Sequence, residues 1–115
     1  MKYKLGESKY FEDIKKTLYQ IVAVKDFGKI KKGDIGGWIE NEKNLSHDAS
    51  CWVFENARVF DNARVFDNAW VSRNAMVFGN AKVYGDAWVC GDARVCGNAN
   101  DIEPEQKINP QRKMY

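Results

Sequence analysis

A six-residue pattern of small, apolar and polar positions runs without interruption from residue 51 to residue 98. Read from Cys51, the units are CWVFEN, ARVFDN, ARVFDN, AWVSRN, AMVFGN, AKVYGD, AWVCGD and ARVCGN. The first position is Ala in seven of the eight units, the third is always Val, and the sixth is always Asn or Asp. Tandem repetition of this kind predicts a solenoid, in which each unit packs against its neighbours.

Each unit predicts a short strand followed by a corner. Because successive strand residues point to opposite faces, the small residue and the Val share the interior. The second and fourth positions then point outward, and the fourth is Phe or Tyr in five units. The last two positions are mostly Asp-Asn, Gly-Asn or Gly-Asp, which are turn residues that tolerate left-handed backbone. Three units would form one triangular coil, and coils would stack at about 4.8 Å.

This pattern resembles the hexapeptide-repeat, left-handed parallel β-helix proteins, and the resemblance covers about residues 33–99. We therefore predict an all-β fold, a triangular solenoid of three to four coils. The left hand comes from the resemblance alone, because the general rule for parallel crossovers favours the right hand.

The non-repeating ends predict a cap and a tail. Residues 1–32 contain the β-rich stretch LYQIVAV and are expected to form a small β cap, since the open end of a solenoid needs cover. Residues 33–100 are expected to form the β-helix, and residues 101–115 a polar tail. The first coil, 33–50, is degenerate; counting back in sixes places Ile39 and Leu45 at the small position, and Ile35 at a Val position.

Residues 18 apart stack vertically, which sorts the outward side chains into three faces. The first, aromatic face carries Trp52, Trp70, Trp88 and Phe54. The second, basic-aromatic face carries Arg58, Met76, Arg94, Phe60 and Phe78. The third carries Arg64, Lys82, Phe66 and Tyr84.

The Trp column on the first face predicts a flat apolar strip large enough to mark an interaction site. A straight strip is readily self-complementary about a twofold axis, so we expect a homodimer or homotrimer. Two alternatives stay open: the rings simply stabilise one another, as cross-strand pairs do, or they bind a different protein such as one of a bacterial host.

The second and third faces mix basic and aromatic side chains, a combination that can bind single-stranded nucleic acid. We favour a structural interpretation, in which the Arg side chains cover the Phe rings as cation–π pairs. The net charge of +2, from 18 Lys and Arg against 16 Asp and Glu, also argues against a nucleic-acid binder.

Composition points to a cytoplasmic protein with reduced thiols. The three cysteines are an odd number, and the first residues lack the apolar stretch of a secretion signal. No apolar run is long enough to span a membrane. Cys51 replaces an interior Ala, and the spacing of Cys90 and Cys96 fits neither a disulfide nor a zinc site.

The sequence offers few candidate catalytic residues. Many proteins that this chain resembles are acyltransferases that use acyl-coenzyme A, and some use a His as general base. The single His of the chain, His47, lies in the degenerate coil at an inward position, and the repeats contain no inserted loop. We therefore assign no catalytic residue, cofactor or metal, and treat an acyltransferase as the alternative.

The segment TLYQIVAVKDFGKIKKGDIGGWIENEKNLS (residues 17–46), followed by the NARVF-type repeats, resembles small phage and prophage proteins. That resemblance implies a bacterial host and a binding role. Our main prediction is a non-enzymatic binding or assembly protein that uses the three faces, with inhibition of a bacterial defence system as the sharper hypothesis. Weak nucleic-acid binding is a further alternative.

Overall fold

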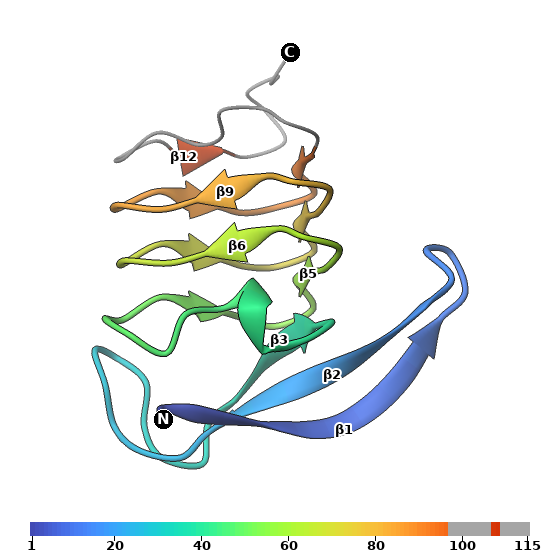
Figure 1. Ribbon diagram of the computed structural model, residues 1–115. Helices are drawn as coiled ribbons and strands as arrows, with labels where there is room; N and C mark the ends of the chain where they lie inside the picture. The colour runs from blue at the N-terminus through green and yellow to red at the C-terminus, as the bar shows by residue number, and fades with distance from the viewer. Residues whose placement is uncertain (97–106, 109–115) are drawn as a thin grey trace.

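The computed structural model describes residues 1–96 and 107–108 (Figure 1). Three longer strands come first: β1 (Tyr3–Phe11), β2 (Lys16–Ala23) and β3 (Ile35–Ile39). A 3-10 turn, η1 (Glu42–Asn44), follows. The remaining strands have two residues each: β4 (Trp52–Val53), β5 (Arg58–Val59), β6 (Arg64–Val65), β7 (Trp70–Val71), β8 (Met76–Val77), β9 (Lys82–Val83), β10 (Trp88–Val89), β11 (Arg94–Val95) and β12 (Lys107–Ile108).

The short strands stack as coils of a parallel β-helix, as Figure 1 shows. Strand β7 lies between β4 and β10 in one sheet, β8 between β5 and β11 in a second, and β6 pairs with β9 in a third. All these pairs are parallel and join residues 18 apart, such as Trp52 with Trp70 and Trp70 with Trp88. The predicted all-β, parallel β-helical fold is confirmed.

Ala and Val fill the interior of the coils. Every Ala at the first position and every Val at the third position of the repeats is buried. Full burial of one Val side chain stabilises a fold by about 1.5–3 kcal/mol, and the stacked Val columns add this at every coil. Backbone hydrogen bonds join the coils, for example from Phe60 N to Val77 O at 3.0 Å.

The fifth position of each unit turns the corner with left-handed backbone. The φ angle there is positive in every unit from 51 to 92, at Glu55, Asp61, Asp67, Arg73, Gly79, Gly85 and Gly91. Three carboxylates at this position also link neighbouring coils. Asp61 Oδ2 accepts the Gly79 N–H at 3.1 Å, and Asp67 Oδ2 accepts the Gly85 N–H at 3.0 Å. The carboxylate of Glu55 accepts the Arg73 N–H at 3.0 Å.

Gly79→Val will test the left-handed corner. Its φ of 67° suits glycine and is tolerated by aspartate, but a β-branched side chain there crowds the backbone. We expect urea unfolding to show a loss of about 1–2 kcal/mol for valine. Gly79→Asp, which copies the residue of two other units, is the control and should cost clearly less. Equal losses for the two variants would contradict this account of the corner.

The N-terminal hairpin continues one sheet of the solenoid. Strands β1 and β2 pair antiparallel, β2 pairs antiparallel with β3, and β3 pairs parallel with β5. Figure 1 shows the hairpin at the N-terminal end of the stack, extending to one side of it. A separate apolar cluster of Phe11, Leu18 and Phe60 attaches the hairpin to the coils.

The first coil has a different register from the one that we predicted. Ile39 pairs with Val59, and Leu45 forms a bridge to Val65, so both occupy Val positions. Leu45 and Val53 are eight residues apart, whereas Val65 and Val71 are six apart, so residues 46–50 contain two extra residues. The backbone absorbs them at Ala49, whose φ is 57°.

Ile35, which we placed at an interior Val position, is 65% exposed instead. It pairs with Val22 at the start of β3, where the chain still belongs to the cap. Of residues 101–115, only β12 is described, and it pairs parallel with β10; the rest of the predicted polar tail lies outside the described residues. In the described part of the chain, no helix is long and apolar enough to cross a membrane.

Candidate functional site: an aromatic groove

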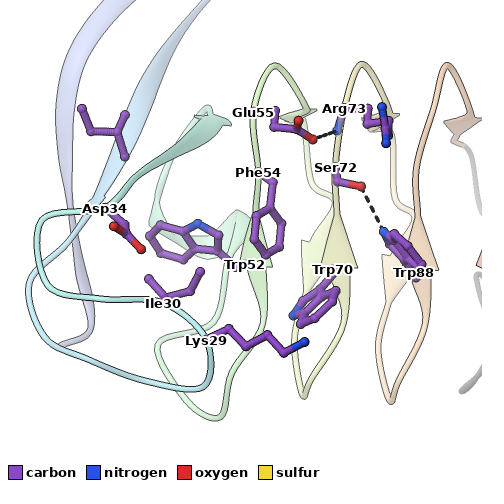
Figure 2. Close-up of a pocket in the computed structure, with 11 residues that line it drawn as sticks. Lys29, Ile30, Asp34, Trp52, Phe54, Glu55, Trp70, Ser72, Arg73 and Trp88 are labelled. Atoms are coloured by element: carbon purple, nitrogen blue, oxygen red, sulfur yellow. Dashed lines mark hydrogen bonds between the residues drawn. The ribbon is translucent and has the colours of Figure 1, made fainter.

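A cavity of about 470 Å³ opens on the first face, and we call it the aromatic groove (Figure 2). The sheet of β4, β7 and β10 contributes its floor, and the segment before β3 contributes its rim. It is lined by Lys29, Ile30, Asp34, Ile35, Trp52, Phe54, Glu55, Trp70, Ser72, Arg73 and Trp88. The structure thus places all four residues predicted for the first face, Trp52, Trp70, Trp88 and Phe54, in one concave site.

The predicted flat Trp strip is wrong, because the cap covers its first member. Trp52 is only 1% exposed. Its indole makes edge contacts with Tyr3 at 6.3 Å and Phe27 at 5.3 Å between ring centroids, as the chain around Phe27 and Ile30 folds over it. Trp52 is therefore part of the core, and only its edge reaches the groove.

The two outer indoles are half-buried and nearly perpendicular. The centroids of Trp70 and Trp88 are 6.2 Å apart with an interplanar angle of 86°. Phe54 meets the Trp70 ring at 5.4 Å and 71°. Aromatic rings favour such edge-to-face contacts over face-to-face stacking, so the backbone column does not become a column of stacked rings.

Ser72 makes room for the groove. The fourth position of its unit, aromatic in five others, here carries a small hydroxyl side chain. Its Oγ accepts a hydrogen bond from the Trp88 indole N–H at 3.0 Å, which fixes that ring (Figure 2). In the sequence, the only sign of this space is that Ser72 replaces the aromatic residue that five other units have at the fourth position.

Charged groups from the cap, the entry to β3 and the coils line the aromatic floor. The Lys29 ammonium lies 5.6 Å from the centroid of the Trp70 ring, a cation–π contact. Arg73 lines the same groove, and Asp34 and Glu55 add carboxylates. Neither Lys29 nor Asp34 was predicted as a site residue, because Lys29 precedes the repeats and Asp34 lies in the degenerate first coil. The groove therefore combines an aromatic floor with two cationic and two anionic side chains, a lining that can hold a flat ring and charged groups.

The second face is partly closed by the hairpin. Phe60 is only 4% exposed, and the Arg58 guanidinium pairs with the Asp13 carboxylate at 2.9 Å. Arg58 also lies over the Phe11 ring, 4.2 Å from its centroid. The open basic-aromatic surface that we predicted here is therefore reduced to its outer part. That part comprises half-buried Met76 and Phe78 and exposed Arg94.

The third face remains open. Arg64 and Lys82 are exposed and pair across β6 and β9, and the rings of Phe66 and Tyr84 stack at 5.3 Å with an interplanar angle of 9°. A cavity of about 350 Å³ lies beside Arg64, Phe66 and Lys82.

His47 lies outside the groove, in the five residues between the first and second coils. Its Nδ1 accepts the Lys2 backbone N–H at 3.3 Å, and its Nε2 lies 2.7 Å from Glu42 Oε1. The imidazole stacks on Tyr3 with centroids 4.0 Å apart. With both nitrogens engaged, this side chain ties the N-terminus to the first coil and is not placed as a base for the groove.

The described residues bring no three His, Cys, Asp or Glu side chains together as a metal site. All three cysteines are free: Cys51 is buried, Cys90 half-buried and Cys96 exposed.

Residues 57–73 match the family described as the YdcK beta solenoid repeat. The chain is also 38% identical over 61 residues to a protein of Escherichia coli strain K12 named as an uncharacterized acetyltransferase, YdcK. That alignment covers 47% of this chain and 19% of the relative, so the chain spans about a fifth of the relative's length. Together with the coils of the structure, the family match shows a repeat β-solenoid protein.

The similarity to a protein named as an acetyltransferase corrects our main functional prediction. We expected a non-enzymatic phage-type binding protein, and the relationship contradicts that expectation. It favours the alternative, an acyltransferase-like protein. The cap segment explains part of the error, since it adds a charged rim to a face that the repeats alone present as a flat apolar strip.

Proposed function

We propose that this chain is an acyl-coenzyme A-dependent acyltransferase, or a β-helical part of one, and that the aromatic groove binds the acyl donor. The observation that carries the proposal is the similarity to a protein named as an acetyltransferase. The groove supports it, because it has the size of a small-molecule site and combines apolar walls with a few charged groups.

Several side chains of the groove suit parts of a coenzyme A thioester. The donor carries an adenine ring, several phosphates and a long flexible arm that ends in the acyl group. The half-buried indoles of Trp70 and Trp88 offer a surface for the ring. Lys29 and Arg73 supply cations for the phosphates, and charge-assisted hydrogen bonds of this type are strong.

Acyl transfer requires an acceptor amine or hydroxyl to attack the thioester carbonyl. A C–N or C–O bond forms, the C–S bond breaks, and the proton of the acceptor ends on the departing sulfur. Asp34 and Glu55 are the groups of the groove that can take up this proton. His47 has no part in this proposal, because its ring nitrogens are engaged with Lys2 and Glu42.

Titration with acetyl-coenzyme A should quench the tryptophan fluorescence of the protein. Lys29→Ala is expected to weaken binding about 10- to 150-fold, because a hydrogen bond to a charged group contributes about 1.5–3 kcal/mol. Lys82→Ala, which removes an exposed cation from the third face, is the matched control and should leave the affinity unchanged.

Turnover is measured as thiol release in the presence of a panel of amines and hydroxyl compounds. Binding without turnover would keep the donor site and require the acceptor or further residues to come from another chain. The absence of any binding at millimolar acetyl-coenzyme A would overturn the proposal, as would equal effects of the two lysine substitutions.

Three of our earlier expectations stay predictions beside this proposal. They are a phage or prophage origin, self-association as a dimer or trimer, and a cytoplasmic location with a bacterial host protein as a partner. None of them depends on whether the chain transfers an acyl group.

A further inference from the structure

Lys2 is a buried cation held by the loop between the first and second coils. Its side chain is 1% exposed, although lysine is almost never fully buried. The ammonium donates to the backbone oxygens of Cys51 at 2.8 Å, Ala49 at 3.1 Å and Asp48 at 3.3 Å. It also lies 4.7 Å from the centroid of the Phe27 ring.

The fourth polar neighbour of the ammonium is a thiol. Lys2 Nζ lies 3.4 Å from Cys51 Sγ, and both groups are shielded from water. Cys51 takes the interior position that Ala holds in the other seven units, so the solenoid does not require a thiol there. The pair is 49 residues apart in sequence, and neither residue lines the aromatic groove proposed above as the donor site.

Burial favours the neutral form of both groups. Desolvation lowers the pKa of the Lys2 ammonium and raises the pKa of the Cys51 thiol. A neutral amine is a nucleophile and a base, whereas an ammonium is neither. Burial of this pair thus favours the neutral amine over the ammonium, and the neutral amine is the form that can attack an oxidised sulfur 3.4 Å away.

We propose that Lys2 and Cys51 form an oxidation-sensitive pair, in which hydrogen peroxide drives a reversible covalent bond between Nζ and Sγ. The sulfur first attacks peroxide; the O–O bond breaks, sulfur is oxidised to a sulfenic acid, and the peroxide is reduced to water. The Lys2 amine then attacks that sulfur; the S–O bond breaks, and the hydroxyl leaves as a second water with a proton from the amine. Sulfenic acids condense with thiols and with amide nitrogen in this way, and a primary amine at contact distance is the nucleophile available here.

The bond would fasten the N-terminus of the cap to the irregular loop of the solenoid. It closes a loop of 49 residues, and a cross-link of that span removes conformational freedom from the unfolded chain. Oxidised protein should therefore unfold at a higher temperature than reduced protein. Thiol reductants cleave the S–N bond and restore the amine and the thiol.

The test uses the full chain with Cys90→Ser and Cys96→Ser, so that Cys51 is the remaining thiol. After peroxide treatment, intact mass spectrometry should show the loss of two hydrogen atoms, and dithiothreitol should reverse it. Protease mapping should give one peptide that joins the N-terminus to the segment around Cys51. The treated protein should also melt at a higher temperature.

Lys2→Arg is the matched control, because it keeps the cation but replaces the nucleophilic amine. Cys51→Ala, which restores the residue of the other repeats, is the second control and is expected to fold. Neither variant should lose two hydrogen atoms. The proposal is overturned if Cys51 only gains oxygen atoms, if it stays unmodified, or if Lys2→Arg shows the same mass loss.

Discussion

Trp52→Ala is expected to lower the free energy of unfolding by about 3–5 kcal/mol, the usual cost of truncating a buried Trp to Ala. Trp52 is the largest fully buried side chain of the structure. It stands between the solenoid and the cap, in edge contact with Tyr3 and Phe27. Its removal leaves a cavity where the two parts meet, so the cap should also dock less firmly.

Trp88→Ala is the matched control on the same column. Trp88 occupies the same position two coils further along, where its indole is half-buried and hydrogen-bonds to Ser72. We expect it to cost under about 2 kcal/mol, since less apolar surface returns to water. Urea unfolding followed by circular dichroism gives both values. Similar losses for the two variants would show that the cap does not bury Trp52 in solution.

The repeats were predictable because every coil has the same pattern of interior and corner residues. Because small residues and Val alternate along each strand, only one face of the strand can be buried. The corner residues that follow every fourth position determine where the chain turns. The structure follows this pattern from Cys51 to Val95, down to the positive φ at Asp61 and the other fifth positions.

The first coil was not predictable by the same reasoning. Counting back in sixes assumes an unbroken period, and the two extra residues between Leu45 and Val53 break it. Leu45 is apolar in either register, so hydrophobicity alone could not reveal the shift. A better signal was the run Ser46-His47-Asp48-Ala49-Ser50, which has no apolar residue suited to a Val position.

Only part of the candidate site could be predicted from the sequence. Repetition placed Trp70 and Trp88 on one face, and the structure confirms that placement. Lys29 and Asp34 reach the same face from a segment with no period, so no counting rule could bring them there. Without these charged side chains, the face has the apolar character of a self-association interface, and this is why we predicted one.

The two glycines of β3 connect this site to the fold. Gly36 and Gly37 let β3 run close against the next coil, and β3 follows directly on the segment that carries Lys29, Ile30 and Asp34. A Cβ at Gly36 would lie 2.5 Å from Val53 O, next to Trp52. The rim of the groove therefore depends on how closely the cap can approach the coil.

Gly37→Ala is expected to destabilise the protein by about 1–3 kcal/mol, the range for extra volume in a packed core. A Cβ at this position would lie 2.6 Å from Ala57 O and 2.7 Å from Val53 Cγ1. Because the first of these is a backbone atom that hydrogen-bonds to Trp38 N at 2.9 Å, β3 must move away from the coil to relieve the clash.

Gly6→Ala provides the control, since the same change in β1 places a Cβ 3.1 Å from Gln20 O, which a small shift can accommodate. We expect Gly6→Ala to unfold near the wild-type urea midpoint and Gly37→Ala well below it. Because the rim segment leads directly into β3, Gly37→Ala should also weaken the quenching of tryptophan fluorescence by acetyl-coenzyme A, at urea concentrations where the variant is still folded. If Gly37→Ala kept wild-type stability, the close contact between β3 and the coil would be wrong. The hairpin alone would then have to hold the rim over Trp52.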